Sequence, residues 1–155
     1  MQYKTFIREF ELHVQSLSYE QRLNLAISVC KKLYPDYHDF YQENNFGDPD
    51  LLMDMIRLCE EQKIDQSNLQ ENLKLLHAIG PDSDDFGGAM YAINACAAVS
   101  ETMEFIVDKN CIHICAIATC LTDTIDFKIT EDEDLTEEEI YEHVMMMEAR
   151  TYLMS

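Results

Sequence analysis

Apolar residues recur along this chain at intervals of three and four, which is the spacing of one face of an α-helix. The first such face consists of Tyr3, Phe6, Ile7, Phe10, Val14 and Leu17. The same period continues through the 155 residues, without the sustained alternation that is typical of strands. The sequence therefore predicts an all-α fold, a bundle-like single domain over residues 1–155 with about six to eight helices.

Capping residues and prolines mark where these helices begin and end. Ser18, followed three residues later by Gln21, is the capping box of a second helix. Pro35 is expected to interrupt that helix, because proline lacks the backbone N–H and crowds the preceding turn. A short helix should follow and end near residue 47. Asp48 then acts as a cap and Pro49 occupies the first position of another helix.

Further boundaries are visible in the second half of the chain. We expect Asp65 or Ser67 to begin the next helix and Gly80–Pro81 to end it. A long helix with many small residues should cover 89–108, and another should extend from Asn110 to about residue 126. The polar run 127–135 is expected to be a loop. Thr136 and Glu139 form the capping box of the last helix.

The charge is strongly negative and unevenly distributed. Eleven Lys and Arg face 30 Asp and Glu, which gives −19 overall, with −5 in residues 1–80 and −14 in residues 81–155. Between Asp123 and Glu142 there are ten acidic residues and one basic residue, Lys128. Such a surface repels nucleic-acid phosphates and anionic lipid, so we expect neither partner. It either attracts a basic protein or serves only solubility.

The composition indicates a cytoplasmic protein. No apolar run approaches the roughly 18 residues of a membrane span, and charges interrupt the apolar residues of the first helix, unlike a signal peptide. The six cysteines fall in predicted helices rather than in a loop-rich disulfide framework, which favours a reducing compartment.

Two groups of residues are candidate metal sites. Asp82, Asp84 and Asp85 form an acidic loop that either holds a hard cation or caps the following helix, and capping is the preferred interpretation. Cys111, His113, Cys115 and Cys120 contain no CxxC pair, and on a helix His113 points away from Cys111 and Cys115. We therefore expect buried, reduced cysteines and no metal ligands.

Aromatic and methionine clusters allow two interpretations each. Tyr34, Tyr37 and Tyr41 either face a partner or belong to the core with hydroxyls on backbone acceptors, and burial is preferred. The run 145–147, three methionines, must point in three directions, so at least one is expected in the core. We recognise neither a catalytic constellation nor a phosphate-binding glycine loop. The sequence therefore predicts no enzyme and no cofactor.

Two segments resemble a known family. They are LYPDYHDFYQENNFGDP, residues 33–49, and PDSDDFGGAMYAINACAAVSE, residues 81–101. Together they are similar to the YjaG-like family, small bacterial all-helical proteins whose function is not established. The likeness extends over about residues 15–125. It implies an α-helical bundle-like domain and supplies no catalytic residues.

Three hypotheses about function follow. The first is a protein-binding module, in its sharpest form an immunity or antitoxin-type inhibitor of a basic toxin such as a nuclease. The second is a structural or regulatory homo-oligomer, such as a homodimer, and the third is a small metal protein using the Asp82–Asp85 loop. For the first, the expected partner-binding residues are Asp82, Asp84, Asp85, Glu131, Asp132, Glu133, Asp134 and Tyr141.

Overall fold

The computed structural model describes residues 2–82 and 86–155, and these residues form eight helices and no strands. The predicted all-α fold is therefore confirmed. The helices are α1 (Gln2–Ser16), α2 (Tyr19–Asn44), α3 (Pro49–Glu60), α4 (Leu69–Ile79), α5 (Ala89–Asp108), α6 (Ile112–Thr130), α7 (Glu137–Glu142) and α8 (Val144–Met154).

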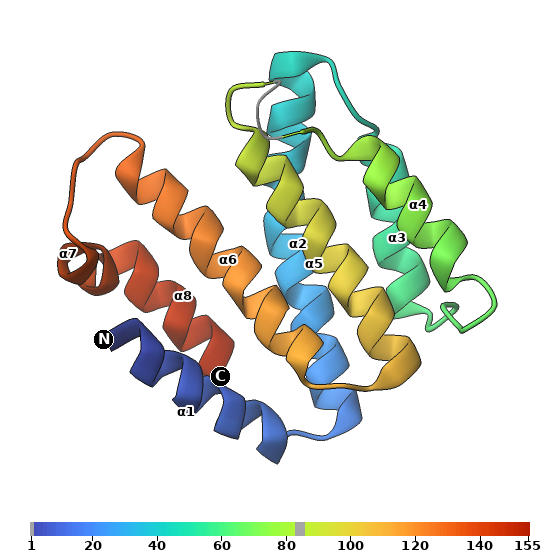
Figure 1. Cartoon of the computed structure of the whole chain (residues 1–155), viewed down its shortest axis with the longest axis horizontal. Coiled ribbons are helices and arrows are strands. Elements are labelled where there is room, and N and C mark those ends of the chain that lie inside the picture. The colour runs from blue at the N-terminus through green and yellow to red at the C-terminus, as the bar shows by residue number, and fades with distance from the viewer. Residues whose placement is uncertain (1, 83–85) are drawn as a thin grey trace.

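Helix α5 lies at the centre of the bundle (Figure 1). It packs along α2 and α6, and α3 and α4 cover its other side. Helices α1 and α8 pack against α6, so the two ends of the chain lie on the same side of the molecule (Figure 1). Ala92, Ala95 and Ala98 of α5 are almost completely buried. Their small side chains let α2 and α6 approach the central helix closely.

The predicted helix starts at Ser18, Asp48 and Thr136 are confirmed. The Ser18 hydroxyl accepts the N–H of Gln21, whose side chain accepts the Ser18 N–H in return. The Asp48 carboxylate accepts the N–H of Leu51, and the capping box at Thr136 has the same reciprocal form as that at Ser18. Each of these bonds satisfies a backbone donor that a helix end would otherwise leave unpaired.

The expectation that Pro35 would end a helix was wrong, because α2 continues through it to Asn44. Pro35 and Lys31, the residue whose carbonyl loses its donor, are both exposed, so water can solvate that carbonyl. Leu33 and Tyr37 on the opposite face are buried at 1% and 0% exposure and hold both halves of the helix against the core. Burial of this face offsets the lost hydrogen bond.

Tyr37 joins three segments that are distant in sequence. Its hydroxyl donates to the carbonyl oxygen of Ile79 at 2.8 Å, at the end of α4. It also accepts the backbone N–H of Asp48 at 2.9 Å, at the start of α3. The hydroxyl of Tyr34 donates to the carbonyl oxygen of Pro49 at 3.2 Å. The interpretation as a core residue with its hydroxyl on the backbone is confirmed for Tyr37, whereas Tyr34 is only partly buried although its hydroxyl also bonds a backbone carbonyl.

Four further expectations about helix boundaries differ from the structure. Helix α4 begins at Leu69 rather than at Asp65 or Ser67, because the Asp65 carboxylate accepts the N–H groups of Ser67 and Asn68 in a turn that precedes the helix.

Helix α6 begins at Ile112, two residues after Asn110, whose side chain accepts the N–H of Ile112. It continues to Thr130, into the segment expected to be a loop, because Ile129 extends its buried face by one turn beyond Ile125.

The last helix is in fact two. His143 has an extended backbone, with ψ at 141°, and separates α7 from α8. Its ring Nδ1 accepts the N–H of Met145 at 3.2 Å and so caps α8. In the part of the chain that the structure describes, no helix combines the length and apolar character that spanning a membrane requires.

Candidate functional site

The sequence predicted a binding surface in the acidic segment 123–142, and its last part, residues 131–142, is called the acidic C-terminal surface below. Glu131, Asp132, Glu133 and Asp134 follow the end of α6, and all four are exposed. Glu137, Glu138 and Glu139 occupy the first turn of α7, where the helix dipole favours negative charge. Within the described residues, none of the carboxylates of this surface belongs to a salt bridge.

Nearby basic side chains are already engaged. Lys128, one turn before the acidic surface, pairs with Asp36 of α2 at 2.8 Å. Arg150 of α8 donates to the carbonyl oxygen of Tyr141 at 2.6 Å, and its guanidinium lies 3.6 Å from the centre of the Tyr141 ring. Lys128 is therefore paired with another acid, and the Arg150 guanidinium covers one face of the Tyr141 ring. The acidic surface keeps a large excess of negative charge, which Arg150 offsets only in part.

Apolar side chains border this surface on α8. Val144 is 61% exposed and Met147 is 51% exposed. They are three residues apart, so they lie on one face of the helix. Met146 is 4% exposed, which confirms that one of the three methionines belongs to the core. Val144 and Met147 are thus a more accessible apolar anchor than Tyr141, which is half-buried.

At its other end the acidic surface meets the start of α5. The Tyr91 hydroxyl donates to Glu131 at 3.2 Å, and the Tyr91 ring meets Phe127 edge to face at a centroid distance of 6.3 Å. Burial, together with the Glu131 carboxylate, raises the pKa of Tyr91 to about 12. Phe127 remains 40% exposed, so a second apolar side chain lies beside the acids.

Asp82 is exposed and lies apart from the acidic surface. It lines a cleft of about 540 Å³ between α4 and α5, together with Ile93 and Ser100 of α5. Tyr91 and Asn94, by contrast, contact α6 on the opposite side of the central helix. Asp82 therefore lies on the other side of the central helix from Glu131, whereas Glu131–Asp134 and Tyr141 lie in consecutive segments, the connection after α6 and helix α7. Asp84 and Asp85 lie outside the described residues.

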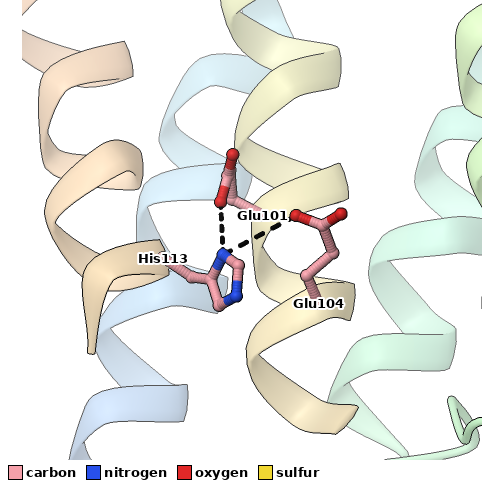
Figure 2. A group of neighbouring side chains, drawn as sticks. All are labelled: Glu101, Glu104 and His113. Atoms are coloured by element: carbon pink, nitrogen blue, oxygen red, sulfur yellow. Dashed lines mark hydrogen bonds and ion pairs between the residues drawn. The ribbon is translucent and has the colours of Figure 1, made fainter. Parts of the chain in front are cut away.

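A second polar cluster lies where α5 ends and α6 begins, and Figure 2 shows three of its members. His113 Nδ1 of α6 is 2.6 Å from Glu101 Oε2 and 3.6 Å from Glu104 Oε2, both on α5 (Figure 2). His113 Nε2 is 2.9 Å from Asp108 Oδ2, at the last residue of α5. The imidazole is therefore placed among three carboxylates.

The charges in this cluster influence one another. Partial burial favours a lower pKa for His113, but hydrogen bonds to Asp108 and Glu101 outweigh it and raise the pKa above its usual value. Burial and then the Glu101 carboxylate raise the pKa of Glu104. One imidazolium does not neutralise three carboxylates, so negative charge remains in excess.

Sequence reasoning did not identify this cluster, although a signal was present. Glu101, Glu104 and Asp108 are spaced three and four apart, so they share one face of α5. His113 follows across a short connection, which places it at the start of the next helix. Spacing within one helix relates His113 only to residues such as Cys115, whereas its contacts come from α5.

The cysteines are all free thiols. Cys30, Cys59, Cys96 and Cys120 are buried, whereas Cys111 and Cys115 are half-buried. Burial raises the pKa of the Cys30 thiol to about 12 and that of Cys115 to about 11. The expectation that most of the cysteines are buried is confirmed.

Comparison with known proteins places the chain in a family. Residues 9–153 match a family described as "Protein of unknown function (DUF416)". The "Uncharacterized protein YjaG" of Escherichia coli is 30% identical over 95 residues, which cover 58% of this chain and 48% of that protein. The protein of the same name in Salmonella typhimurium is 29% identical over 97 residues, covering 59% and 50%. The chain spans about half the length of these relatives.

A solved structure agrees with the fold. The crystal structure of a DUF416 family protein from Shewanella baltica has a TM-score of 0.80 at 24% identity and covers 94% of this chain and 82% of that one. The names of the relatives confirm the resemblance drawn from residues 33–49 and 81–101. With its match over residues 9–153, the chain belongs to the DUF416 family of bacterial relatives, for which no function is established.

Proposed function

We propose that this protein is a cytoplasmic, non-catalytic module that binds a basic protein through its acidic C-terminal surface. One observation carries the proposal. Carboxylates 131–134 are exposed and form no salt bridge among the described residues, and the exposed Val144 and Met147 lie nearby in sequence on α8. Carboxylates that form no ion pair within the chain can steer a basic protein toward this surface. The neighbouring pair of apolar side chains can supply the affinity for that partner.

The charges act mainly on how fast a partner arrives. Complementary fields raise association rates, and salt screens exposed charges over about 10 Å at 0.1 M. The apolar side chains act on how long the partner stays, because contacts that exclude water determine dissociation. Phe127, on the other side of the acids, extends the apolar border.

The sharpest form of the proposal is an immunity or antitoxin-type inhibitor. A toxin that grips nucleic-acid phosphates needs a basic groove, and a surface with exposed carboxylates on a loop and a helix is complementary to it. Binding of that kind blocks the groove without chemistry from this chain. The absence of a catalytic constellation in the sequence is consistent with such a role.

The experiment begins with the untagged native chain, which is used to recover and identify its partner from cytoplasm. Association is then measured for a variant carrying E131Q, D132N, E133Q and D134N. A matched control carries E9Q, E11Q, E20Q and E43Q, which neutralise four exposed acids elsewhere. The first variant should associate about tenfold more slowly at low salt and nearly normally at high salt, and the control should change little.

Three outcomes would contradict the proposal. An acidic partner would remove its electrostatic basis. Equal rates for both variants at low salt would make the acidic surface a solubility feature. If the chain instead recovers only itself and its mass rises with concentration, the homo-oligomer hypothesis replaces the proposal.

A further inference from the structure

The His113 cluster has the composition of a metal site. Glu101 and Glu104 project from α5 and His113 from α6 toward one point, as Figure 2 shows. One ligand atom from each residue lies within 4.8 Å of the other two. One imidazole nitrogen and two carboxylate oxygens are a donor set that Zn²⁺ accepts, with the fourth position open to water.

Asp108 orients the imidazole for such a role. Its carboxylate is 2.9 Å from His113 Nε2, so Nε2 carries the proton that it donates. A ligating histidine commonly donates its second ring N–H to a carboxylate, which fixes the tautomer and the ring orientation. Here that arrangement directs Nδ1 toward Glu101 and Glu104. Asp108 is therefore a positioning residue rather than a ligand.

We propose that Glu101, Glu104 and His113 bind a divalent transition-metal cation, of which Zn²⁺ fits the donor set best. This site is independent of the proposed protein-binding surface and uses different residues. The sequence predicted no metal ligand at His113. The site also differs from the Asp82–Asp85 loop, the candidate metal site of the sequence-based hypothesis.

The spacing of the ligands suits this cation. Donors about 2.0–2.1 Å from a tetrahedral Zn²⁺ lie about 3.4 Å apart. The 3.6 Å between His113 Nδ1 and Glu104 Oε2 is close to that value. The 2.6 Å between Nδ1 and Glu101 Oε2 is shorter, because these two atoms share a hydrogen bond. When the cation binds, His113 Nδ1 loses the proton that it shares with Glu101, and the Glu101 side chain rotates to make room.

The position of Glu104 is not needed to hold the His113 ring in place. Its carboxylate is partly buried and is directed at His113, yet within the described residues no hydrogen bond to it is formed. Glu101 and Asp108 already satisfy both ring nitrogens of His113. A third carboxylate therefore faces the ring without a bonding partner of its own, and a divalent cation would supply one.

The site is also reachable. The side chains of Glu101 and Glu104 are 31% and 38% exposed, whereas that of His113 is 14% exposed. A cation can therefore enter past the glutamates, and the imidazole forms the inner wall.

The test is a Zn²⁺ titration of the full chain after treatment with a chelator, followed by calorimetry and by the NMR signals of the His113 ring. Excess Mg²⁺ is present throughout, because this hard cation occupies exposed carboxylates but not an imidazole site. We expect one Zn²⁺ per chain, a shift of the His113 signals and a higher Tm. Glu104→Gln and His113→Asn should each weaken binding at least about tenfold, and Asp108→Asn by about 10- to 100-fold.

Two controls separate this site from other zinc ligands. The double variant C111S/C115S removes the half-buried thiols, and the variant neutralised at residues 131–134 removes the exposed acids. Both should bind Zn²⁺ like the original chain. Zinc binding that survives both Glu104→Gln and His113→Asn would overturn the proposal, as would the absence of binding by a folded chain. Glu104→Gln retains the bonds of His113 to Glu101 and Asp108, so it should remain folded.

Discussion

Removing the Tyr37 hydroxyl should lower the free energy of unfolding, because this hydroxyl makes two hydrogen bonds to the backbone. This hydroxyl lies inside the bundle, on a side chain with 0% exposure. It donates to the Ile79 carbonyl oxygen and accepts the N–H of Asp48. Tyr37→Phe removes one oxygen atom and leaves both backbone groups without that partner. The aromatic ring still fills its place, so no large cavity forms.

The two lost bonds differ in cost. The bond to Ile79 is buried, so its carbonyl incurs much of the roughly 1–3 kcal/mol penalty for an unsatisfied buried group. The Asp48 N–H is only partly buried, and water can replace part of its bond. The loss of both hydrogen bonds in Tyr37→Phe should lower the free energy of unfolding by about 2 kcal/mol. For a domain of this size that corresponds to a fall in Tm of about 4–8 °C.

Gly47 provides a second measurement of the same contact. Its φ is +104°, which disfavours any side chain, and a Cβ there would overlap the Tyr37 hydroxyl oxygen. Gly47→Ala should therefore destabilise the protein through backbone strain and through this overlap. Tyr37→Phe removes the overlap but not the strain. The double variant should be less destabilised than the two single variants added together, by about 1 kcal/mol.

The assay is urea unfolding of the single and double variants, followed by circular dichroism. Tyr41→Phe is the matched control, because it lies one turn later on α2 and its hydroxyl has no hydrogen bond within the described part of the chain. That control should change the free energy of unfolding by less than about 0.5 kcal/mol. Equal effects of Tyr37→Phe and Tyr41→Phe, or strictly additive Tyr37 and Gly47 variants, would refute the reasoning.

Three further predictions concern other parts of the chain. Pro35→Ala restores the N–H that can bond the Lys31 carbonyl and should stabilise the protein by about 1 kcal/mol or more in urea unfolding; a loss of stability would contradict this. A thiol reagent should modify Cys111 well before Cys30, whose thiol pKa burial raises to about 12; equal rates in the folded protein would disagree. Met147→Ala should speed dissociation of a bound partner by about tenfold without changing the salt dependence of association; unchanged dissociation would exclude Met147 as an anchor.

Much of the fold follows from local signals in the sequence. The capping boxes at Ser18 and Thr136 and the Asp48–Pro49 start involve residues at most three apart, so spacing alone predicts them. The apolar period predicts the inward faces, and α5 begins and ends at the residues expected, 89 and 108. The acidic character of residues 131–142 is likewise a property of composition, and the segment is exposed as a charged run should be.

Tertiary structure decided the features that depend on neighbours distant in sequence. Helix α2 continues through Pro35 because core packing on its opposite face outweighs one lost hydrogen bond, and helical propensity alone does not include that packing. Tyr37 meets Ile79 across 42 positions. His113 meets Glu101 because α5 and α6 fold back on each other, so its donors lie on another helix, where the spacing within its own helix does not reveal them. Local hydrogen bonds determine where helices start, whereas long-range burial determines how far they extend and which polar groups come together.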